Sequence, residues 1–389
     1  MSIQPFKIDI PQATLDDLRE RLARTRWPDE VEGAGWDYGT NLGYMKEFAD
    51  YWQHTFDWRK QEAKLNQFAQ FRAEVDGVGI HFIHERGKGP NPLPILLTHG
   101  WPDSICRYLK MIPMLTDPAK YGGDPNDSFD VIVPSLPGFG FSDRPSVRGA
   151  TSIRSADILA RLMTEALGYT QFAAAGGDIG SPVTRLLALA HPESLVGIHL
   201  TDIGFPREIA FPPDLSNPSR AEQQFLSSVQ GWFMQEGAYA LLQSTKPQTL
   251  AYGLNDSPVG LASWIMEKFR AWSDCGGNIE QRFSKDELLT NIMIYWVTET
   301  ISSTARLYYE DAHTPPQLKP GQYIEVQAGV ATFPKDLTLP PRELGERFLR
   351  VERWTEMPRG GHFAALEEPE LLAEDMRAFF HDLKAKNLA

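Results

Sequence analysis

The residue on which the chemistry of this chain depends is Asp178, which stands in the run Gly176-Gly-Asp-Ile-Gly180. An apolar stretch precedes this run and a helical pattern follows it, so we expect a sharp turn from a strand into a helix. Small residues flank the acid because so tight a turn leaves no space for side chains. A carboxylate is ionised at neutral pH and can attack a saturated carbon without a base, forming an ester. Hydrolysis of that ester then requires a base and an oxyanion hole.

Two later residues are candidates for that base and for the acid that orients it. His362 stands in a glycine-rich loop after the last expected strand, and Asp336 follows a strand expected to end near Ala328. The order Asp178, Asp336, His362 is that of nucleophile, acid and histidine in the α/β-hydrolase fold. Taken alone, each of these residues is more often structural. Their agreement in order and in position after strands favours the catalytic interpretation.

Two backbone N–H groups and two tyrosines complete the candidate site. The segment His99-Gly-Trp-Pro102 ends a buried strand, and the loop after that strand supplies one oxyanion donor in this fold, here the N–H of Trp101. The second donor is the N–H of Ile179, the residue after the nucleophile. Tyr239 and Tyr308 fall on helices expected in a lid, where a tyrosine is otherwise most often a packing residue.

The order of the sequence patterns predicts an α/β fold with an α/β-hydrolase core, a helical lid and a helical N-terminal extension. Strands and helices alternate over residues 71–204, which favours a mostly parallel sheet, and the core resumes over residues 321–389. Residues 205–320 between them show long helical patterns, a size typical of a lid domain. Residues 1–70 show helical patterns and no chemistry of their own, so we expect an extension packed on the core.

Within these parts the patterns predict particular elements. A hairpin is expected around Asp76-Gly77, which separates two alternating strands. The longer helices are expected over residues 153–167, 220–243, 261–273, 286–309 and 368–383, and the late strands over residues 323–327 and 348–352. Neither an internal repeat nor a low-complexity tract is evident.

Composition limits the classes of function. The 389 residues are 42% apolar and 23% charged, which is typical of a soluble globular protein. A net charge of -13 argues against nucleic acid and anionic membranes as partners. Cys106 and Cys275 show neither disulfide nor metal-ligand spacing. Neither a membrane span of ~20 apolar residues nor a signal-peptide pattern is present, so we expect a cytoplasmic protein. The sequence is compatible with a homo-oligomer and does not determine the oligomeric state.

The same residues carry a resemblance to a known family. The chain resembles, nearly from end to end, the microsomal-type epoxide hydrolases of the α/β-hydrolase superfamily, including their soluble bacterial members. The segments that carry the resemblance are Thr25-Arg-Trp-Pro28, Phe56-Asp-Trp-Arg59, His99-Gly-Trp-Pro102, Gly176-Gly-Asp-Ile-Gly180, Thr245-Lys-Pro247, Leu254-Asn-Asp-Ser-Pro-Val-Gly260, Arg306-Leu-Tyr308 and Gly360-Gly-His-Phe-Ala-Ala-Leu-Glu-Glu-Pro369. The mammalian forms carry Glu where Asp336 stands. Their membrane-anchoring N-terminal segment has no counterpart here, so we expect no membrane anchor.

The resemblance implies a role for each candidate residue. Asp178 is implied as the nucleophile, His362 as the base and Asp336 as the acid that orients it. Tyr239 and Tyr308 are implied as the groups that donate a proton to the epoxide oxygen. The implied substrates are a small apolar epoxide and water, the implied product is a vicinal diol, and neither a metal nor an organic cofactor is expected.

Two other functions remain open from the sequence. A haloalkane or haloacid dehalogenase uses the same triad, but such enzymes usually place a halide-binding Trp after the nucleophile, where this chain has Ile179. A non-catalytic ligand-binding receptor on the same fold is the second alternative, although here every catalytic role is filled. A serine esterase is disfavoured because the sequence contains no Gly-x-Ser-x-Gly motif. These motifs do not identify the epoxide, the carbon attacked, the enantiopreference or the metabolic role.

Overall fold

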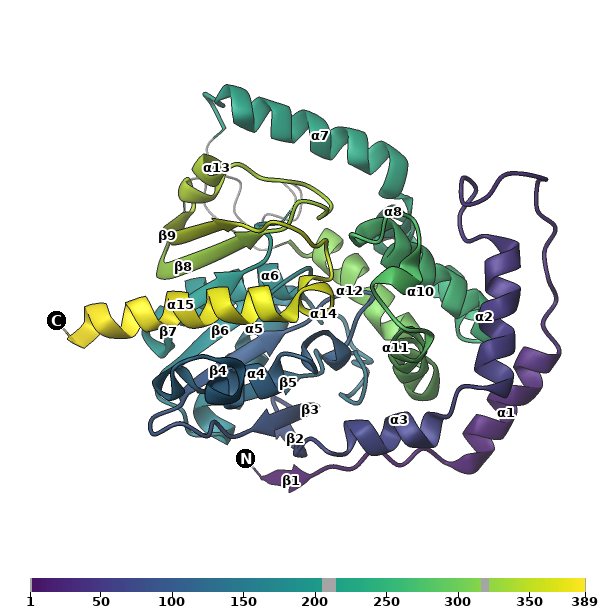
Figure 1. Cartoon of the computed structure of the whole chain (residues 1–389), viewed down its shortest axis with the longest axis horizontal. Coiled ribbons are helices and arrows are strands. Elements are labelled where there is room, and N and C mark those ends of the chain that lie inside the picture. The colour runs from purple at the N-terminus through teal and green to yellow at the C-terminus, as the bar shows by residue number, and fades with distance from the viewer. Residues whose placement is uncertain (1, 205–214, 316–321, 389) are drawn as a thin grey trace.

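A sheet of nine strands forms the centre of the computed structural model, which describes residues 2–204, 215–315 and 322–388 (Figure 1). The strands lie side by side in the order β1-β2-β3-β5-β4-β6-β7-β8-β9. Their bounds are β1 Ile3–Pro5, β2 Gln70–Val75, β3 Val78–Glu85, β4 Leu93–Thr98, β5 Phe129–Pro134, β6 Phe172–Gly176, β7 Leu195–Leu200, β8 Ile324–Thr332 and β9 Leu349–Glu356. The pairs from β1 to β5 are antiparallel and those from β5 to β9 are parallel. The predicted α/β-hydrolase arrangement is therefore confirmed.

Helices cover both faces of this sheet, so its central strands are buried and read as continuous apolar runs. In Figure 1, α4 and α15 lie on the near face and pack on each other, while α5 and α6 pack together on the far face. The core helices are α4 Ile112–Thr116, α5 Ser152–Arg161, α6 Gly180–Ala190, α13 Arg342–Glu346, α14 Ala364–Glu367 and α15 Pro369–Leu388. A wider helical turn over Leu162–Ala166 continues α5, which accounts for the longer helix that the sequence predicts there.

Six helices of the described residues form the lid above the carboxyl ends of the strands (Figure 1). They are α7 Arg220–Glu236, α8 Ala238–Thr245, α9 Pro247–Leu254, α10 Pro258–Trp272, α11 Lys285–Thr298 and α12 Ile301–His313. The helix expected over residues 220–243 is divided at Gly237, and the one expected over residues 286–309 is divided at Glu299, whose φ of 54° is left-handed. The predicted limits of the lid, residues 205 and 320, lie outside the described residues.

The N-terminal extension contains α1 Gln12–Ala23, α2 Leu42–His54 and α3 Trp58–Leu65, and it also supplies strand β1 at the edge of the sheet. The extension is therefore not purely helical, contrary to what the sequence led us to expect. Its helices also pack against α10 and α11 of the lid, and not only on the core. The Tyr51 hydroxyl donates to Asp286 over 2.9 Å, and Arg21 forms an ion pair of 2.7 Å with Asp256. The extension thus connects the core to the outer side of the lid.

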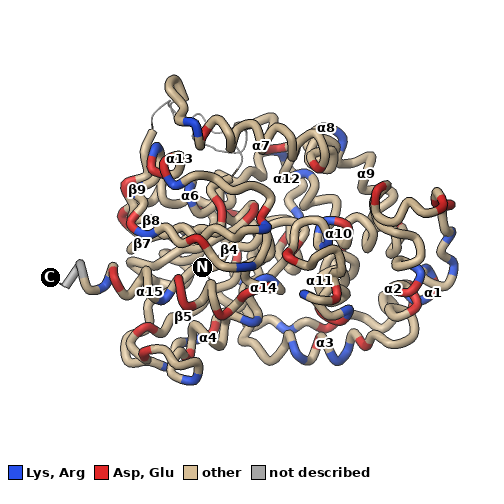
Figure 2. Tube along the Cα trace, turned by 45° about the horizontal axis from the view of Figure 1, so that its top comes forward, with Lys and Arg blue, Asp and Glu red and all other residues tan. Residues whose placement is uncertain are grey.

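The late core strands are longer than their sequence patterns predict. Strand β8 continues past Ala328 to Thr332, and Asp336 follows four positions after that end. The hairpin is as expected, with β2 and β3 paired around Asp76-Gly77. Figure 2 shows acidic and basic residues interspersed along the chain. Across the described part of the chain, no helix combines the length and the apolarity that a bilayer span requires.

Candidate active site

The expected turn at Asp178 is present between β6 and α6. Asp178 has a φ of 55°, a left-handed conformation that a residue with a Cβ rarely adopts. A Cβ at Gly176 would lie 2.2 Å from the carbonyl oxygen of Gly180, and one at Gly180 would lie 1.9 Å from that of Thr98. The Asp178 N–H donates to Oδ2 of Asp202 over 2.8 Å, which helps to hold the strained turn. The two glycines are therefore required by the close approach of backbone to backbone.

The three residues of the predicted triad form one hydrogen-bonded chain. Nε2 of His362 lies 3.0 Å from Oδ2 of Asp178, and Nδ1 of His362 lies 2.7 Å from Oδ1 of Asp336. The His362 side chain is buried, with 3% of its surface exposed. The backbone N–H of His362 donates to the carbonyl oxygen of Trp272, and its own carbonyl accepts from Arg107. Segments far apart in the sequence thus fix the imidazole between two carboxylates.

The charges around His362 strongly favour its protonated form. Burial lowers the pKa of His362, but the carboxylates of Asp336 and Asp178 outweigh burial and raise this pKa to about 10. The imidazolium is therefore the expected form near neutral pH while both carboxylates carry their charge. Loss of either negative charge would lower the pKa of His362 towards its ordinary value of about 6.5.

The expected oxyanion donors, Trp101 and Ile179, lie beside Asp178. The Trp101 N–H donates to Oδ1 of Asp178 over 2.7 Å. A Cβ at Gly100 would lie only 2.1 Å from the same oxygen, so the segment before Trp101 must stay free of a side chain. Ile179, the second expected donor, has helical backbone angles at the entrance to α6. Among the described residues, the hydrogen bonds to the Asp178 carboxylate come from Trp101 and His362, and the Ile179 N–H makes none to it.

The two lid tyrosines converge on the same tryptophan. Tyr239 lies on α8 and Tyr308 on α12, as the sequence predicts. The Tyr239 ring stacks on Trp101 with centroids 5.2 Å apart, and the Tyr308 ring meets Trp101 edge-on at 6.0 Å. The two tyrosine rings are 6.1 Å apart. The backbone N–H of Trp101 binds Asp178, and its indole ring contacts both tyrosine rings, so Trp101 connects the two tyrosines with the turn at Asp178.

A small cavity of about 30 Å³ lies beside the triad. Its polar walls are the side chains of Asp178, Asp202, Asp336 and His362. A space of this size exceeds the ~10–15 Å³ that a water molecule needs, and the site offers several polar partners. The geometry can therefore hold a water next to the imidazole. Among the described residues, this site included, we find no group of three or more His, Cys, Asp or Glu side chains that could hold a metal ion.

Comparisons with known proteins agree with this geometry. Residues 3–108 match the family described as epoxide hydrolase N terminus, and residues 94–255 match the alpha/beta hydrolase fold. A provisionally named epoxide hydrolase of Stigmatella aurantiaca is 46% identical over 99% of this chain and 86% of its own length. Epoxide hydrolase 1 of Sus scrofa is 38% identical over 97% of this chain and 88% of its own length.

The chain belongs to the epoxide hydrolase family. The solved structure of juvenile hormone epoxide hydrolase from Bombyx mori covers 99% of this chain, with 94% of that protein matched, 28% identity and a TM-score of 0.84. The epoxide hydrolase of Aspergillus niger covers 98% of this chain, with 97% of that protein matched, 29% identity and the same TM-score of 0.84. The family and the enzyme class expected from the sequence are therefore confirmed.

One residue near the triad of this epoxide hydrolase was missed by sequence reasoning. Asp202 is half-buried and lies two positions after the end of β7, the same offset that separates Asp178 from the end of β6. Burial and the nearby Asp336 raise the pKa of Asp202 to about 6. Acids placed just after neighbouring parallel strands meet at one edge of the sheet, so this offset was a usable signal. Asp202 accepts the backbone N–H of Asp178 and lines the small cavity.

Lys268 is a second residue without a sequence signal. It lies on α10 with its side chain buried, and its ammonium is 5.0 Å from the Tyr239 ring centroid and 5.6 Å from that of Trp272. The same ammonium forms ion pairs with two carboxylates, those of Glu267 at 2.7 Å and Glu236 at 3.3 Å. A buried cation close to the face of an aromatic ring is attracted by the negative quadrupole of that ring.

Proposed function

We propose that this chain converts an epoxide and water to a vicinal diol through a covalent ester on Asp178. The observation that carries the proposal is the hydrogen-bonded chain from Asp178 through His362 to Asp336, with the Trp101 N–H on the other oxygen of Asp178. The aromatic surroundings of the nucleophile suit a small apolar epoxide. A cytoplasmic location remains a prediction from the sequence.

In the first step, Oδ2 of Asp178 attacks a ring carbon of the epoxide. The carbon–oxygen bond of the ring breaks, and its electron pair moves to the epoxide oxygen. Tyr239 and Tyr308 donate hydrogen bonds to that oxygen, and one of them transfers its proton. We assign the attack to Oδ2 because the Trp101 N–H is bound to Oδ1, which would become the ester carbonyl oxygen.

In the second step, water attacks the carbonyl carbon of that ester. Formation of the ester removes the negative charge of Asp178, one of the two carboxylates that raise the pKa of His362. The imidazolium therefore becomes more acidic, gives its proton through water to the tyrosinate formed in the first step, and can then act as a base. A water in the small cavity beside the triad would lie next to this base.

The remaining proton transfers complete the cycle. His362 takes a proton from the water, and the hydroxide adds to the ester carbonyl carbon. Negative charge then develops on Oδ1, where the Trp101 N–H at 2.7 Å stabilises it together with the adjacent Ile179 N–H. The diol leaves with Oδ2 and the proton held by His362. The carboxylic acid that remains on Asp178 then gives its proton to His362, which restores the carboxylate and the imidazolium.

Lys268 supports the first step in this scheme. Proton transfer from Tyr239 leaves negative charge on the phenol ring, and the Lys268 ammonium lies 5.0 Å from the centroid of that ring. The cation is buried, so its field is screened less than it would be at the surface. Lys268 is therefore proposed as a positioning residue that offsets the negative charge left on Tyr239 after proton transfer.

An isotope experiment tests the proposed pathway. One turnover of styrene oxide with enzyme in excess, in water enriched in oxygen-18, should place the label in the peptide that contains Asp178. The diol of that turnover should carry none, because its new oxygen is Oδ2 of Asp178. Label in the first-turnover diol would mean direct attack by water on the epoxide and would refute the ester. Asp178→Asn, which lacks the nucleophilic carboxylate, should form no diol in the same assay.

A further inference from the structure

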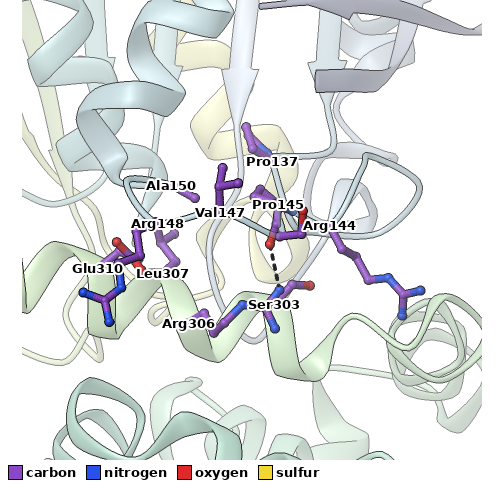
Figure 3. A pocket seen from close by; sticks show the side chains of 11 residues that line it. Pro137, Arg144, Pro145, Val147, Arg148, Ala150, Ser303, Arg306, Leu307 and Glu310 are labelled. Carbon is purple, nitrogen blue, oxygen red and sulfur yellow. Dashed lines mark hydrogen bonds between the residues drawn. The ribbon is translucent and has the colours of Figure 1, made fainter. Parts of the chain in front are cut away.

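A second cavity, of about 360 Å³, lies between the loop that follows β5 and helix α12 (Figure 3). Its volume falls at the lower end of the range of small-molecule pockets. The residues that line it are Pro137, Arg144, Pro145, Ser146, Val147, Arg148, Ala150, Ser303, Arg306, Leu307 and Glu310. The cavity beside the triad shares none of these residues. We refer to this second cavity as the arginine pocket.

Positive charge is concentrated in the arginine pocket although the chain as a whole has a net charge of -13. Arg144 and Arg148 come from the loop, and Arg306 comes from α12 (Figure 3). The charge of Arg144 acts on Arg306, and like charges that interact in this way destabilise the fold unless an opposite charge offsets them. The local excess of cations is therefore a feature that folding alone does not favour.

Arg306 is the most informative of the three arginines because it is half-buried. Its guanidinium donates to Oγ of Ser302 over 3.2 Å and to the carbonyl oxygen of Pro145 over 3.0 Å. Within the described ranges of the chain, it forms no ion pair with a carboxylate. Burial, and then the nearby charge of Arg144, lower the pKa of Arg306. The site therefore contains a partly desolvated cation with unused capacity to bind an anion.

The acidic groups near the pocket are already engaged. Glu299 pairs with Arg144 at 3.1 Å, and the Glu310 carboxylate accepts the N–H of Gly149 at 2.8 Å. Arg148 is exposed and, in the part of the chain that the structure describes, forms neither an ion pair nor a hydrogen bond. Three arginines thus face two carboxylates, which leaves a surplus of positive charge in the pocket.

We infer that the arginine pocket binds a small organic carboxylate, with Arg306 and Arg148 on the carboxylate and an apolar group against the remaining wall. A guanidinium presents two parallel N–H groups that match the two oxygens of a carboxylate. Pro137, Val147 and Leu307 supply apolar surface within the same cavity. An anion with an apolar body therefore fits the pocket better than a neutral or a cationic ligand does.

Benzoate is the probe for this site, and benzamide is its uncharged counterpart of the same shape. Titration calorimetry should show saturable binding of benzoate to the wild-type chain and much weaker binding of benzamide. Arg306→Gln and Arg148→Gln should each weaken benzoate binding by about tenfold or more, because each removes a charged hydrogen-bond donor. Arg148 is exposed, so its substitution tests the site without disturbing the core.

Arg19→Gln is the matched control, since Arg19 is an exposed arginine on α1 that does not line the pocket. This variant should bind benzoate as the wild type does. Arg306→Lys keeps the charge but loses the planar pair of donors, so its affinity for benzoate should lie between those of wild type and Arg306→Gln. Benzoate affinity that is the same in wild type, Arg306→Gln and Arg148→Gln would overturn the inference. Binding of benzamide as tight as that of benzoate would overturn it as well.

Discussion

Replacing His362 by glutamine should separate the two proposed chemical steps. Ester formation requires an ionised carboxylate, and the hydrogen bond from His362 to Oδ2 of Asp178 stabilises that carboxylate rather than activating it. The variant should therefore still open the epoxide. Ester hydrolysis requires a base that takes a proton from water. Glutamine is not such a base, and Asp336, which binds Nδ1 of His362 in the wild type, does not replace it. The covalent ester should accumulate.

The size of the effect follows from the function that is lost. General-base assistance contributes about 10²–10⁴-fold to a rate, so steady-state diol formation should fall by at least about 10²-fold. The Trp101 N–H remains bound to Oδ1 of Asp178 and still stabilises the oxyanion, which leaves a slow residual hydrolysis. One fast equivalent of epoxide consumption per enzyme should precede this slow phase.

Rapid quenching followed by intact-mass spectrometry measures this outcome directly. His362→Gln should gain the mass of one styrene oxide molecule within the first turnover, and digestion should locate the adduct on Asp178. His381→Gln is the matched control, because His381 is an exposed histidine of α15 bound to Asp127. That control should show neither adduct nor loss of rate. If His362→Gln shows neither a fast first turnover nor an adduct, the role assigned to His362 is wrong.

Four further outcomes are expected. Lys268→Met should slow ester formation about 2–30-fold in stopped-flow measurements, because a cation over a ring contributes about 0.5–2 kcal/mol. Asp202→Ala leaves the Asp178 N–H without its acceptor and should lower the free energy of unfolding in urea by about 1–3 kcal/mol, whereas Asp202→Asn keeps an oxygen there and should cost less. Gly100→Ala should retain the circular dichroism spectrum of the fold but lose at least about 10²-fold in kcat, since its Cβ would lie 2.1 Å from Oδ1 of Asp178. The pKa of His362 is raised to about 10 in the folded chain, so the contribution of His362 to the free energy of unfolding should be complete below pH ~6.5 and disappear as pH rises through 10. Over that range, the unfolding free energies of wild type and His362→Gln, measured in urea, should converge.

The site was predictable from the sequence where local constraints act. The turn at Asp178 needs small neighbours because backbone atoms approach a would-be Cβ to 2.2 Å or less, and that requirement is visible as glycine in the sequence. His362 and Asp336 were found because chain order and position after strands constrain them. The apolar runs of the central strands followed in the same way from their burial on both faces.

What the sequence did not predict depends on contacts between distant segments. The strand β1 has only three residues, and its conformation comes from pairing with β2 rather than from its own pattern. The break between α11 and α12 depends on the left-handed conformation of one residue, Glu299. The helical spacing on either side of Glu299 does not predict this break. The position of Lys268 over Tyr239 is set by the packing of α10 against α8, which no local pattern encodes.

The contacts of the His362 loop also limit how this lid can open. The His362 N–H donates to the carbonyl oxygen of Trp272 at the end of α10, and the buried carboxylate of Glu367 accepts N–H groups from both Gly361 and Asp274. Each such bond contributes about 0.5–1.5 kcal/mol, more where a carboxylate accepts. Lifting the end of α10 would break these bonds and release the base from its position against Asp178. We therefore expect substrate to reach Asp178 by movements that leave this end of the lid in place, because Trp272 and Asp274 of the lid support the loop that carries His362.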